Sequence, residues 1–391
     1  MNYNIEKRTL HFKQPAGTSR GVYTTRKIWL VNLSDGERLG VGECAPLPDL
    51  SCDAMEDGRY EEILDQFCKR LCETGETDYE AMRDYPSMLF GLETALLALR
   101  QAQGLLFDTA FSRGEEGIPI NGLVWMGNYD EMLQRMEEKL EKGFRCVKLK
   151  IGAIDFDKEL DLIKRIRDRY SFHEVELRVD ANGAFEFDEA LYKLELLSQY
   201  NIHSIEQPIK KGQWAFMAEL CRESPLPIAL DEELIGVNDP EMKRHMLNVI
   251  KPRYIILKPS LHGGMTGCRE WIDTAKDMGI GSWITSALES NIGLNAIAQF
   301  ASDVYGDNIT MPQGLGTGQL FTDNIPLPLE IRGPGQIHAD GQAFHIQRRA
   351  PTFLRFEHFA GRVPHEQPHL YRRVVVSVLL TVQILLHEIL V

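Results

Sequence analysis

The stretch RCVKLKIG, residues 145–152, decides the fold of this chain. Its apolar residues alternate with Lys148 and Lys150, which is the pattern of a β-strand. Side chains two residues apart leave the same face of a strand. Two ammonium groups therefore point the same way from an otherwise apolar element. This arrangement requires negative charge on neighbouring strands.

Composition sets the class of protein. The 391 residues are 43% hydrophobic and 26% charged, with a formal net charge of −14, typical of a globular chain long enough for two domains. The negative charge argues against a nucleic-acid partner, but a few lysines in a cleft can still bind a small anionic carboxylate. Seven scattered cysteines and the absence of a secretion signal in the first residues predict a cytoplasmic protein without a disulfide framework.

Patterning divides the chain into three segments. Residues 1–115 predict an α+β domain, with two antiparallel strands within 20–48 and helices near 60–73 and 87–103. In residues 116–330, short β-rich runs alternate with amphipathic helical runs, which indicates parallel βα units. The predicted strands lie at residues 118–125, 146–152, 175–183, 202–209, 227–234, 254–261 and 281–290, with a weaker one at 310–318. Eight strands in about 200 residues favour a closed barrel.

The third segment, residues 331–391, ends in 18 mostly apolar residues from 374 to 391. This length is the lower limit for a membrane-spanning helix. A membrane anchor is disfavoured because polar residues interrupt the run, yet the tail leaves it open. The alternatives are a packed terminal element and a terminus that is not the natural one. The sequence does not indicate an oligomeric state.

Polar residues end the predicted barrel strands, where active sites of such barrels lie. Asp180, Glu206, Asp231 and Lys258 follow one another at intervals of 26, 25 and 27 residues. One βα unit has about this length, so we expect the four to converge at one mouth. Further polar residues at strand ends are Asn182, Ser286, Glu289 and Ser290.

Three clustered carboxylates cannot all stay ionised without a cation. Oxygen ligands favour a hard ion, so we expect Asp180, Glu206 and Asp231 to bind Mg²⁺, with Mn²⁺ as a substitute. A metal beside two lysines, Lys150 and Lys258, predicts removal of a proton α to a carboxylate, because the metal stabilises the developing charge. Burial and a second cation are expected to lower the pKa of a lysine, so that its neutral amine is present at neutral pH. Charge repulsion from Lys148 would favour this form in Lys150.

The K-x-K pattern at 148–150, followed by the three acids and Lys258, resembles the muconate-lactonising branch of the enolase superfamily. The resemblance covers residues 1–354. Within that branch, four segments are similar to the o-succinylbenzoate synthase family: GVGECAPLP (40–48), INGLVWMG (120–127), TSALESNIGLNAIAQFA (285–301) and GLGTGQLFTDN (314–324).

The resemblance implies an α/β fold, a (β/α)7β-type modified TIM barrel with an N-terminal α+β capping domain that also includes part of the C-terminal segment. It implies a Mg²⁺-dependent syn-dehydration, with Lys150 as base and then acid and Lys258 opposite it. Lys148 and Asn182 would support these groups. Ser286, Glu289 and Ser290 would lie near the substrate or its supporting residues, and residues 14–23 would close over the site.

Two alternatives stay open. N-succinylamino acid racemases and dipeptide epimerases use the same pair of lysines. The D-x-D expected of dipeptide epimerases is missing from residues 314–321, and SALESNIG (286–293) differs from the usual racemase pattern. A non-catalytic, membrane-tethered barrel is the second alternative; it is supported by the apolar tail and opposed by the complete set of catalytic positions.

Overall fold

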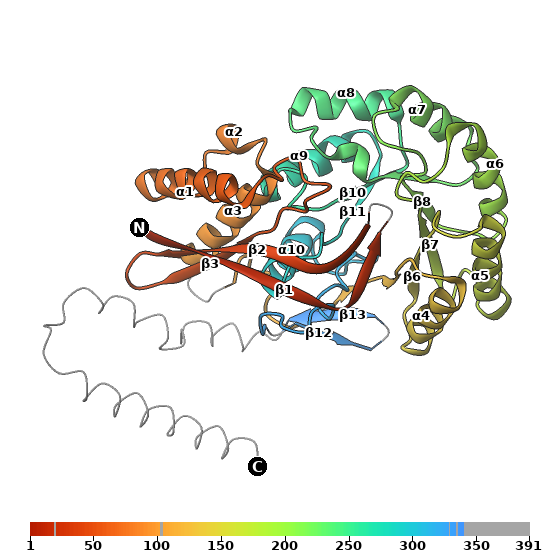
Figure 1. Ribbon diagram of the computed structural model, residues 1–391, viewed down its shortest axis with the longest axis horizontal. Helices are drawn as coiled ribbons and strands as arrows, with labels where there is room; N and C mark the ends of the chain where they lie inside the picture. Colours follow the sequence, from red (N-terminus) through yellow and green to blue (C-terminus); the bar gives the residue numbers. More distant parts are fainter. Residues whose placement is uncertain (19–20, 102–104, 328, 334, 340–391) are drawn as a thin grey trace, which may run out of the picture. The chain divides into compact units, whose positions relative to one another are not determined.

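The computed structural model describes residues 1–18, 21–101, 105–327, 329–333 and 335–339 (Figure 1). All of them belong to one compact unit, Met1–Arg348. The apolar tail at 374–391 lies outside the described residues. Within the described ranges, no helix combines the length and the apolar character that crossing a membrane requires.

The N-terminal domain is a three-stranded antiparallel sheet packed against helices. It consists of β1 (Asn2–Thr18), β2 (Gly21–Ser34), β3 (Leu39–Cys44), α1 (Asp57–Thr74), α2 (Tyr79–Met82) and α3 (Pro86–Arg100). The predicted β2–β3 pair is confirmed, with Ser34 opposite Leu39. Strand β1 was not predicted, because most of its residues are exposed and give no regular apolar alternation.

Glycines let α3 approach the sheet closely. A Cβ atom at Gly40 or Gly42 of β3 would collide with backbone atoms of α3 at Ala95 and Gly91. Helix α3 is buried along nearly its whole length and carries one acid, Glu93. The glycines of the GVGEC segment therefore let α3, with its buried carboxylate Glu93, pack directly on β3.

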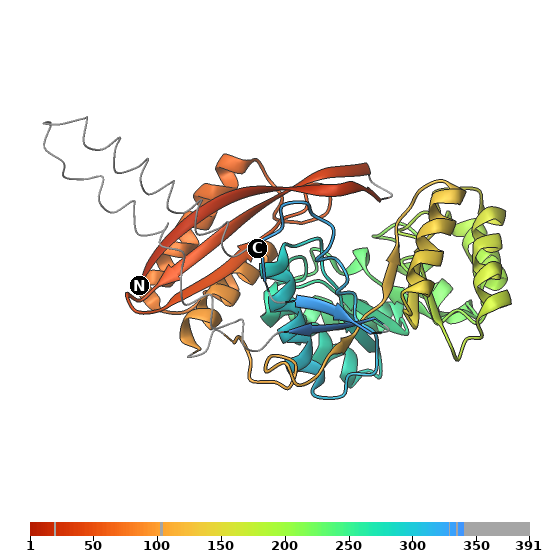
Figure 2. The ribbon, with the colours of Figure 1, turned by 90° about the horizontal axis from the view of Figure 1, so that it is seen from below.

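The second domain contains a seven-stranded parallel sheet in chain order. Its strands are β5 (Gly122–Val124), β6 (Cys146–Lys150), β7 (Glu176–Asp180), β8 (Ser204–Glu206), β9 (Ile228–Leu230), β10 (Tyr254–Leu257) and β11 (Gly281–Ile284). The helices between and after them are α4 (Tyr129–Glu141), α5 (Phe156–Arg169), α6 (Phe187–Ser198), α7 (Trp214–Glu223), η1 (Glu232–Leu234), α8 (Pro240–Ile250), α9 (Gly264–Asp277) and α10 (Asn291–Tyr305). The α-helices cover the outside of the curved sheet (Figures 1 and 2).

The predicted eighth strand is reduced to two residues that close the barrel. Gln313 makes a parallel bridge to Ile120, and Gly314 makes one to Thr285. The Asn121 N–H donates to Gln313 O at 3.0 Å, and the Gly314 N–H donates to Ile284 O at 2.8 Å. The (β/α)7β-type barrel is therefore confirmed, and its last unit is a strand-like crossing within a glycine-rich segment.

A small outer sheet lies next to the segment that leads into the first barrel strand, β5. It has the order β12 (Leu329–Arg332), β13 (Gln336–Ala339), β4 (Ile118–Pro119). The sequence-based boundary at residue 330 falls inside β12, so the start of the predicted third segment pairs with the barrel domain.

Candidate active site

Strand register places three of the predicted residues side by side. Lys150 of β6 lies opposite Asp180 of β7, and Asp180 lies opposite Glu206 of β8. Residues in register on adjacent parallel strands point to the same side of the sheet. Asp180 and Glu206 are each only 1% exposed. The structure therefore converts the even spacing along the chain into one row of charges.

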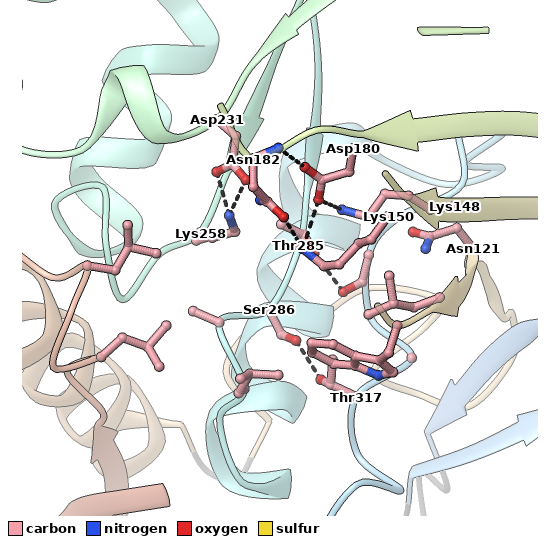
Figure 3. A pocket seen from close by; sticks show the side chains of 18 of the residues that line it. Asn121, Lys148, Lys150, Asp180, Asn182, Asp231, Lys258, Thr285, Ser286 and Thr317 are labelled. Atoms are coloured by element: carbon pink, nitrogen blue, oxygen red, sulfur yellow. Dashed lines mark hydrogen bonds and ion pairs between the residues drawn. The ribbon is translucent and has the colours of Figure 1, made fainter. Parts of the chain in front are cut away.

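Asp231 and Lys258 complete the row just beyond the next two strands. Asp231 follows β9 at the start of η1 and is buried, and Lys258 follows β10. Both carboxylate oxygens of Asp231 contact the Lys258 ammonium. Figure 3 shows this pair on one side of the pocket and Lys150 with Asp180 on the other.

Each lysine is held by carboxylate oxygens. Lys148 Nζ lies 2.5 Å from Glu206 Oε2 and 3.3 Å from Asp180 Oδ2. Lys150 Nζ lies 3.1 Å from Asp180 Oδ2 and donates to Asn182 Oδ1 at 2.7 Å. The two ammonium groups of the RCVKLKIG strand thus have direct carboxylate partners on β7 and β8.

The carboxylates differ in their titration. Burial and the charge of Asp180 raise the pKa of Glu206 to about 8, although Lys148 opposes this. Burial alone would raise the pKa of Asp180 as well, but the charges of Lys150 and Lys148 outweigh it and hold that pKa below its usual range. The two neighbouring carboxyl groups therefore differ in acidity: Asp180 is strongly acidic and Glu206 is weakly acidic.

Carboxylates hold two of the lysines in their charged form. Burial disfavours the charged form of Lys148, yet the charges of Glu206 and Asp180 raise its pKa. Asp231 likewise outweighs burial and raises the pKa of Lys258. Direct contact with carboxylates therefore outweighs burial in both groups and keeps them positively charged.

The donor set fits a hard divalent cation. Asp180, Glu206 and Asp231 supply carboxylate oxygens from three consecutive strands, which suits Mg²⁺ better than zinc. Within the ranges that the structure describes, no three His, Cys, Asp or Glu side chains already stand as a closed metal site. The acids face lysines, and a metal would replace those contacts.

A pocket opens above the charged row. Asn182 and Ser286 line it, together with the lysines, Asp180 and Asp231, and Glu206 lies outside the lining. The Ser286 hydroxyl hydrogen-bonds Thr317 at 2.5 Å. Apolar residues form a large part of the wall: Leu47, Leu50, Leu123, Trp125, Ala287 and Leu288. The pocket can take a molecule with a charged end and an apolar body.

Two predicted residues do not reach this pocket. Glu289 is fully buried, accepts a hydrogen bond from the Ala287 N–H at 2.6 Å and is contacted by the Ser260 hydroxyl at 2.5 Å. Ser290 caps α10, and its N–H donates to Glu43 of β3 at 2.8 Å. Both therefore hold the loop after β11 in place and lie away from the substrate space.

A second acid of the N-terminal domain caps α9. Glu93 accepts hydrogen bonds from the N–H groups of Met265 and Thr266, at 2.6 and 3.1 Å. Burial raises the pKa of Glu93 to about 7. The glycine-rich HGGMTG stretch (262–267) therefore meets a carboxylate of the chain itself, which leaves its helix terminus closed to a phosphate.

Sequence reasoning did not single out Leu47 and Leu50, two of the residues that the N-terminal domain brings to the pocket. Tyr23, Leu47 and Leu50 line it from β2 and the loop after β3. Tyr23 falls within the segment 14–23 that we expected to close over the site. The structure forms most of this segment as strand, because β1 extends to Thr18 and β2 begins at Gly21. Trp125 lies just after β5, with its ring 5.9 Å from Lys150 Nζ. The aromatic residue in INGLVWMG was the available signal for this contact.

Comparison with known proteins agrees with this geometry. The family model described as "Enolase C-terminal domain-like" matches residues 131–328, and that described as "MenC, N-terminal domain" matches residues 17–99. An o-succinylbenzoate synthase of Desulfotalea psychrophila is 46% identical over 363 residues, covering 85% of this chain and 98% of that protein.

Two solved structures share the fold. The crystal structure of MenC from Desulfotalea psychrophila LSv54 has a TM-score of 0.72 at 42% identity and covers 87% of this chain and 99% of that one. A dipeptide epimerase from Cytophaga hutchinsonii, complexed with Mg and D-Ala-L-Val, has a TM-score of 0.72 at 20% identity and covers 86% and 92%. The chain belongs to the enolase superfamily and, within it, to the o-succinylbenzoate synthase family, as its motifs predicted.

Proposed function

We propose that the protein is a Mg²⁺-dependent o-succinylbenzoate synthase. It would convert 2-succinyl-6-hydroxy-2,4-cyclohexadiene-1-carboxylate to o-succinylbenzoate by syn-dehydration in menaquinone biosynthesis. The observation that carries this proposal is the 46% identity to an o-succinylbenzoate synthase over 98% of its length. The row of lysines and acids at the barrel mouth supplies the chemistry that the reaction needs.

Asp180, Glu206 and Asp231 are the residues that would hold Mg²⁺, with Mn²⁺ as a substitute. Their oxygen donors and their burial support this assignment. A related fold has been crystallised with Mg. When bound, the ion supplies positive charge that stabilises the substrate carboxylate as further negative charge develops on it.

Lys150 performs both proton transfers. Its neutral amine takes the proton from the carbon that bears the carboxylate, and the C–H electron pair passes into the enediolate. The same group then returns the proton to the departing hydroxyl on the same face, so that water leaves and the ring becomes aromatic. Asn182 orients Lys150 Nζ through the 2.7 Å hydrogen bond.

Lys258 stays protonated and acts through its charge. Its ammonium lies on the Asp231 side of the pocket, across from Lys150 (Figure 3). In this position it stabilises the enediolate electrostatically. The apolar wall with Trp125 and Leu288 receives the ring and excludes water from the reacting carbon.

The test is turnover of the dehydration substrate with and without EDTA. The expected result is formation of o-succinylbenzoate, loss of activity after chelation and recovery on addition of Mg²⁺ or Mn²⁺. Activity that is unaffected by chelation would refute the metal assignment. Absence of dehydration by the metal-loaded protein would refute the reaction.

An N-succinylamino acid racemase or dipeptide epimerase is the second candidate, because the fold and both lysines are compatible with it. The missing D-x-D at 314–321 argues against the epimerase. Rapid deuterium incorporation at the α-carbon of N-succinylamino acids without dehydration would favour the racemase. A non-catalytic, membrane-tethered role is tested by liposome flotation with and without residues 374–391.

The protein would work on a small anionic carboxylate in the cytoplasm, without a nucleic-acid partner. The free state of all seven cysteines, each within the described residues, agrees with a reducing compartment.

A further inference from the structure

The loop that follows β10 closes on the backbone of Lys258. The N–H groups of Leu261 and His262 donate to Lys258 O at 2.8 and 3.0 Å. In the reverse direction, the Lys258 N–H donates to Nδ1 of His262 at 2.8 Å. Both backbone polar groups of Lys258 are thus held by the same short loop.

His262 is suited to this contact as a neutral ring. It is 2% exposed, and burial lowers its pKa to about 3, although Asp231 opposes the lowering that burial and the charges of Lys258 and Lys243 produce. Because Nδ1 accepts the Lys258 N–H, the ring proton lies on Nε2. Nε2 has no hydrogen-bond partner among the described residues. The single hydrogen bond of the ring is therefore the one to Lys258.

We infer that His262 is a positioning residue for Lys258, which fixes its backbone so that the ammonium reaches the pocket at the Asp231 carboxylate. The inference rests on the proposed function for the role of Lys258 in the reaction. A lysine side chain adopts a limited set of staggered rotamers that start from its Cα–Cβ bond. The direction of this bond therefore limits where Nζ can lie. Loss of the acceptor leaves the Lys258 N–H without a partner and lets this direction change.

Other contacts keep the loop folded without His262. Ser260 contacts Glu289, and the N–H groups of Met265 and Thr266 donate to Glu93. These anchors lie on either side of His262. A substitution of His262 should therefore alter the geometry at Lys258 more than the fold of the loop.

The test compares His262→Asn with His262→Gln. The Asn amide oxygen can occupy the position of Nδ1, whereas the Gln amide extends to the position of Nε2. We expect His262→Gln to lower kcat about 100-fold with little change in KM, the cost of misplacing a catalytic group by about 1 Å. His262→Asn should keep most of the wild-type kcat. His245→Asn, at an exposed histidine of α8, is the matched control.

Thermal unfolding and Mg²⁺ calorimetry accompany the kinetics. Similar Tm values and a Mg²⁺ affinity that falls by less than the roughly 10-fold typical of residues orienting a metal ligand would support the inference. Equal kcat losses in both variants, or losses that follow Tm, would overturn it. If the wild type fails to dehydrate, the proposed function is wrong, and the variants are then compared by α-proton exchange, which also uses Lys258.

Discussion

The two sides of the barrel mouth hold their functional groups by different means. On the side of β6, β7 and β8, strand register alone aligns Lys150, Asp180 and Glu206. On the side of β10 and β11, the loops are fixed by the N-terminal domain. Glu43 accepts hydrogen bonds from the N–H groups of Ser290 and Gly293 at the start of α10, and Glu93 caps α9.

Arg26 of β2 adds to this second side. It is 3% exposed and donates to the backbone oxygen of Leu288 at 3.1 Å, as well as to Ala45 O and Pro46 O. Leu288 has a positive φ of 66°, which is uncommon for a residue with a branched side chain. The hydrogen bond from Arg26 helps to hold this conformation beside the pocket.

The side of β6, β7 and β8, the register side, therefore carries most of the charged groups of the reaction, and the side of β10 and β11, the docked side, carries loops that help to enclose the substrate. Register positions are set by backbone hydrogen bonds within one sheet and tolerate little displacement. Domain contacts depend on buried charged groups and on their protonation. We therefore expect changes at the charged row to affect catalysis and charge balance, and changes at the domain contacts of Glu43 and Glu93 to affect stability and its pH dependence.

The largest effect is expected for Lys150→Ala on the register side. Loss of the only group assigned to both proton transfers should reduce kcat by about 10⁴-fold, the upper range for general acid–base catalysis. Mg²⁺ affinity, measured by calorimetry, should change little. Lys158→Ala, at an exposed lysine of α5, is the control. Retained turnover in Lys150→Ala would mean that another residue is the base.

Lys148→Met tests the charge balance of the same side. Glu206 and Asp180 would lose a contacting ammonium group, and breaking such a buried pair costs about 3–5 kcal/mol of unfolding free energy. Urea unfolding in EDTA should show this loss, and added Mg²⁺ should reduce it. Lys158→Met is the surface control. A loss under about 1 kcal/mol in EDTA, or no effect of Mg²⁺, would contradict the assignment of these acids.

Glu93→Gln tests the docked side through pH. Burial raises the pKa of Glu93 from 4.5 to about 7, so the folded protein binds this proton more tightly than the unfolded chain. The resulting stability is full below pH 4.5 and is lost as the pH rises through about 7. Its size is at most about 3 kcal/mol.

The measurement is urea unfolding of wild type and Glu93→Gln across this pH range. The wild type should lose more stability on going to pH 8 than the variant does. Glu73→Gln, at an exposed residue of α1, should follow the wild type. An identical pH dependence in wild type and Glu93→Gln would show that Glu93 ionises at the same pH in the folded and unfolded chain.

The smallest effect is expected for Ser286→Ala at the pocket wall. Removing a hydroxyl that can contact the substrate should raise KM several-fold, or about 1 kcal/mol, and leave kcat unchanged. Thr317→Val, which removes the hydrogen-bond partner of Ser286, should have a weaker effect of the same kind. A fall in kcat at constant KM would contradict the binding role of Ser286 and indicate that it acts in catalysis.

The sequence by itself determined the charged row. The K-x-K strand and the intervals between Asp180, Glu206, Asp231 and Lys258 follow from βα units of nearly constant length, because each unit repeats the same local geometry. Parallel strands of such units end at one edge of a sheet. The residues that meet there can therefore be predicted from local pattern and spacing.

The tertiary structure decided the remaining features. The two-residue closing crossing and the part of the pocket wall formed by Tyr23, Leu47 and Leu50 depend on contacts between distant parts of the chain. The same holds for Ser290, which lies at a predicted strand end but contacts Glu43 of the N-terminal domain. Glu289 is held by Ser260 and Ala287 of neighbouring barrel loops. Local periodicity carries no information about such contacts, because docking of two domains selects which strand-end side chains face the substrate and which face the partner domain.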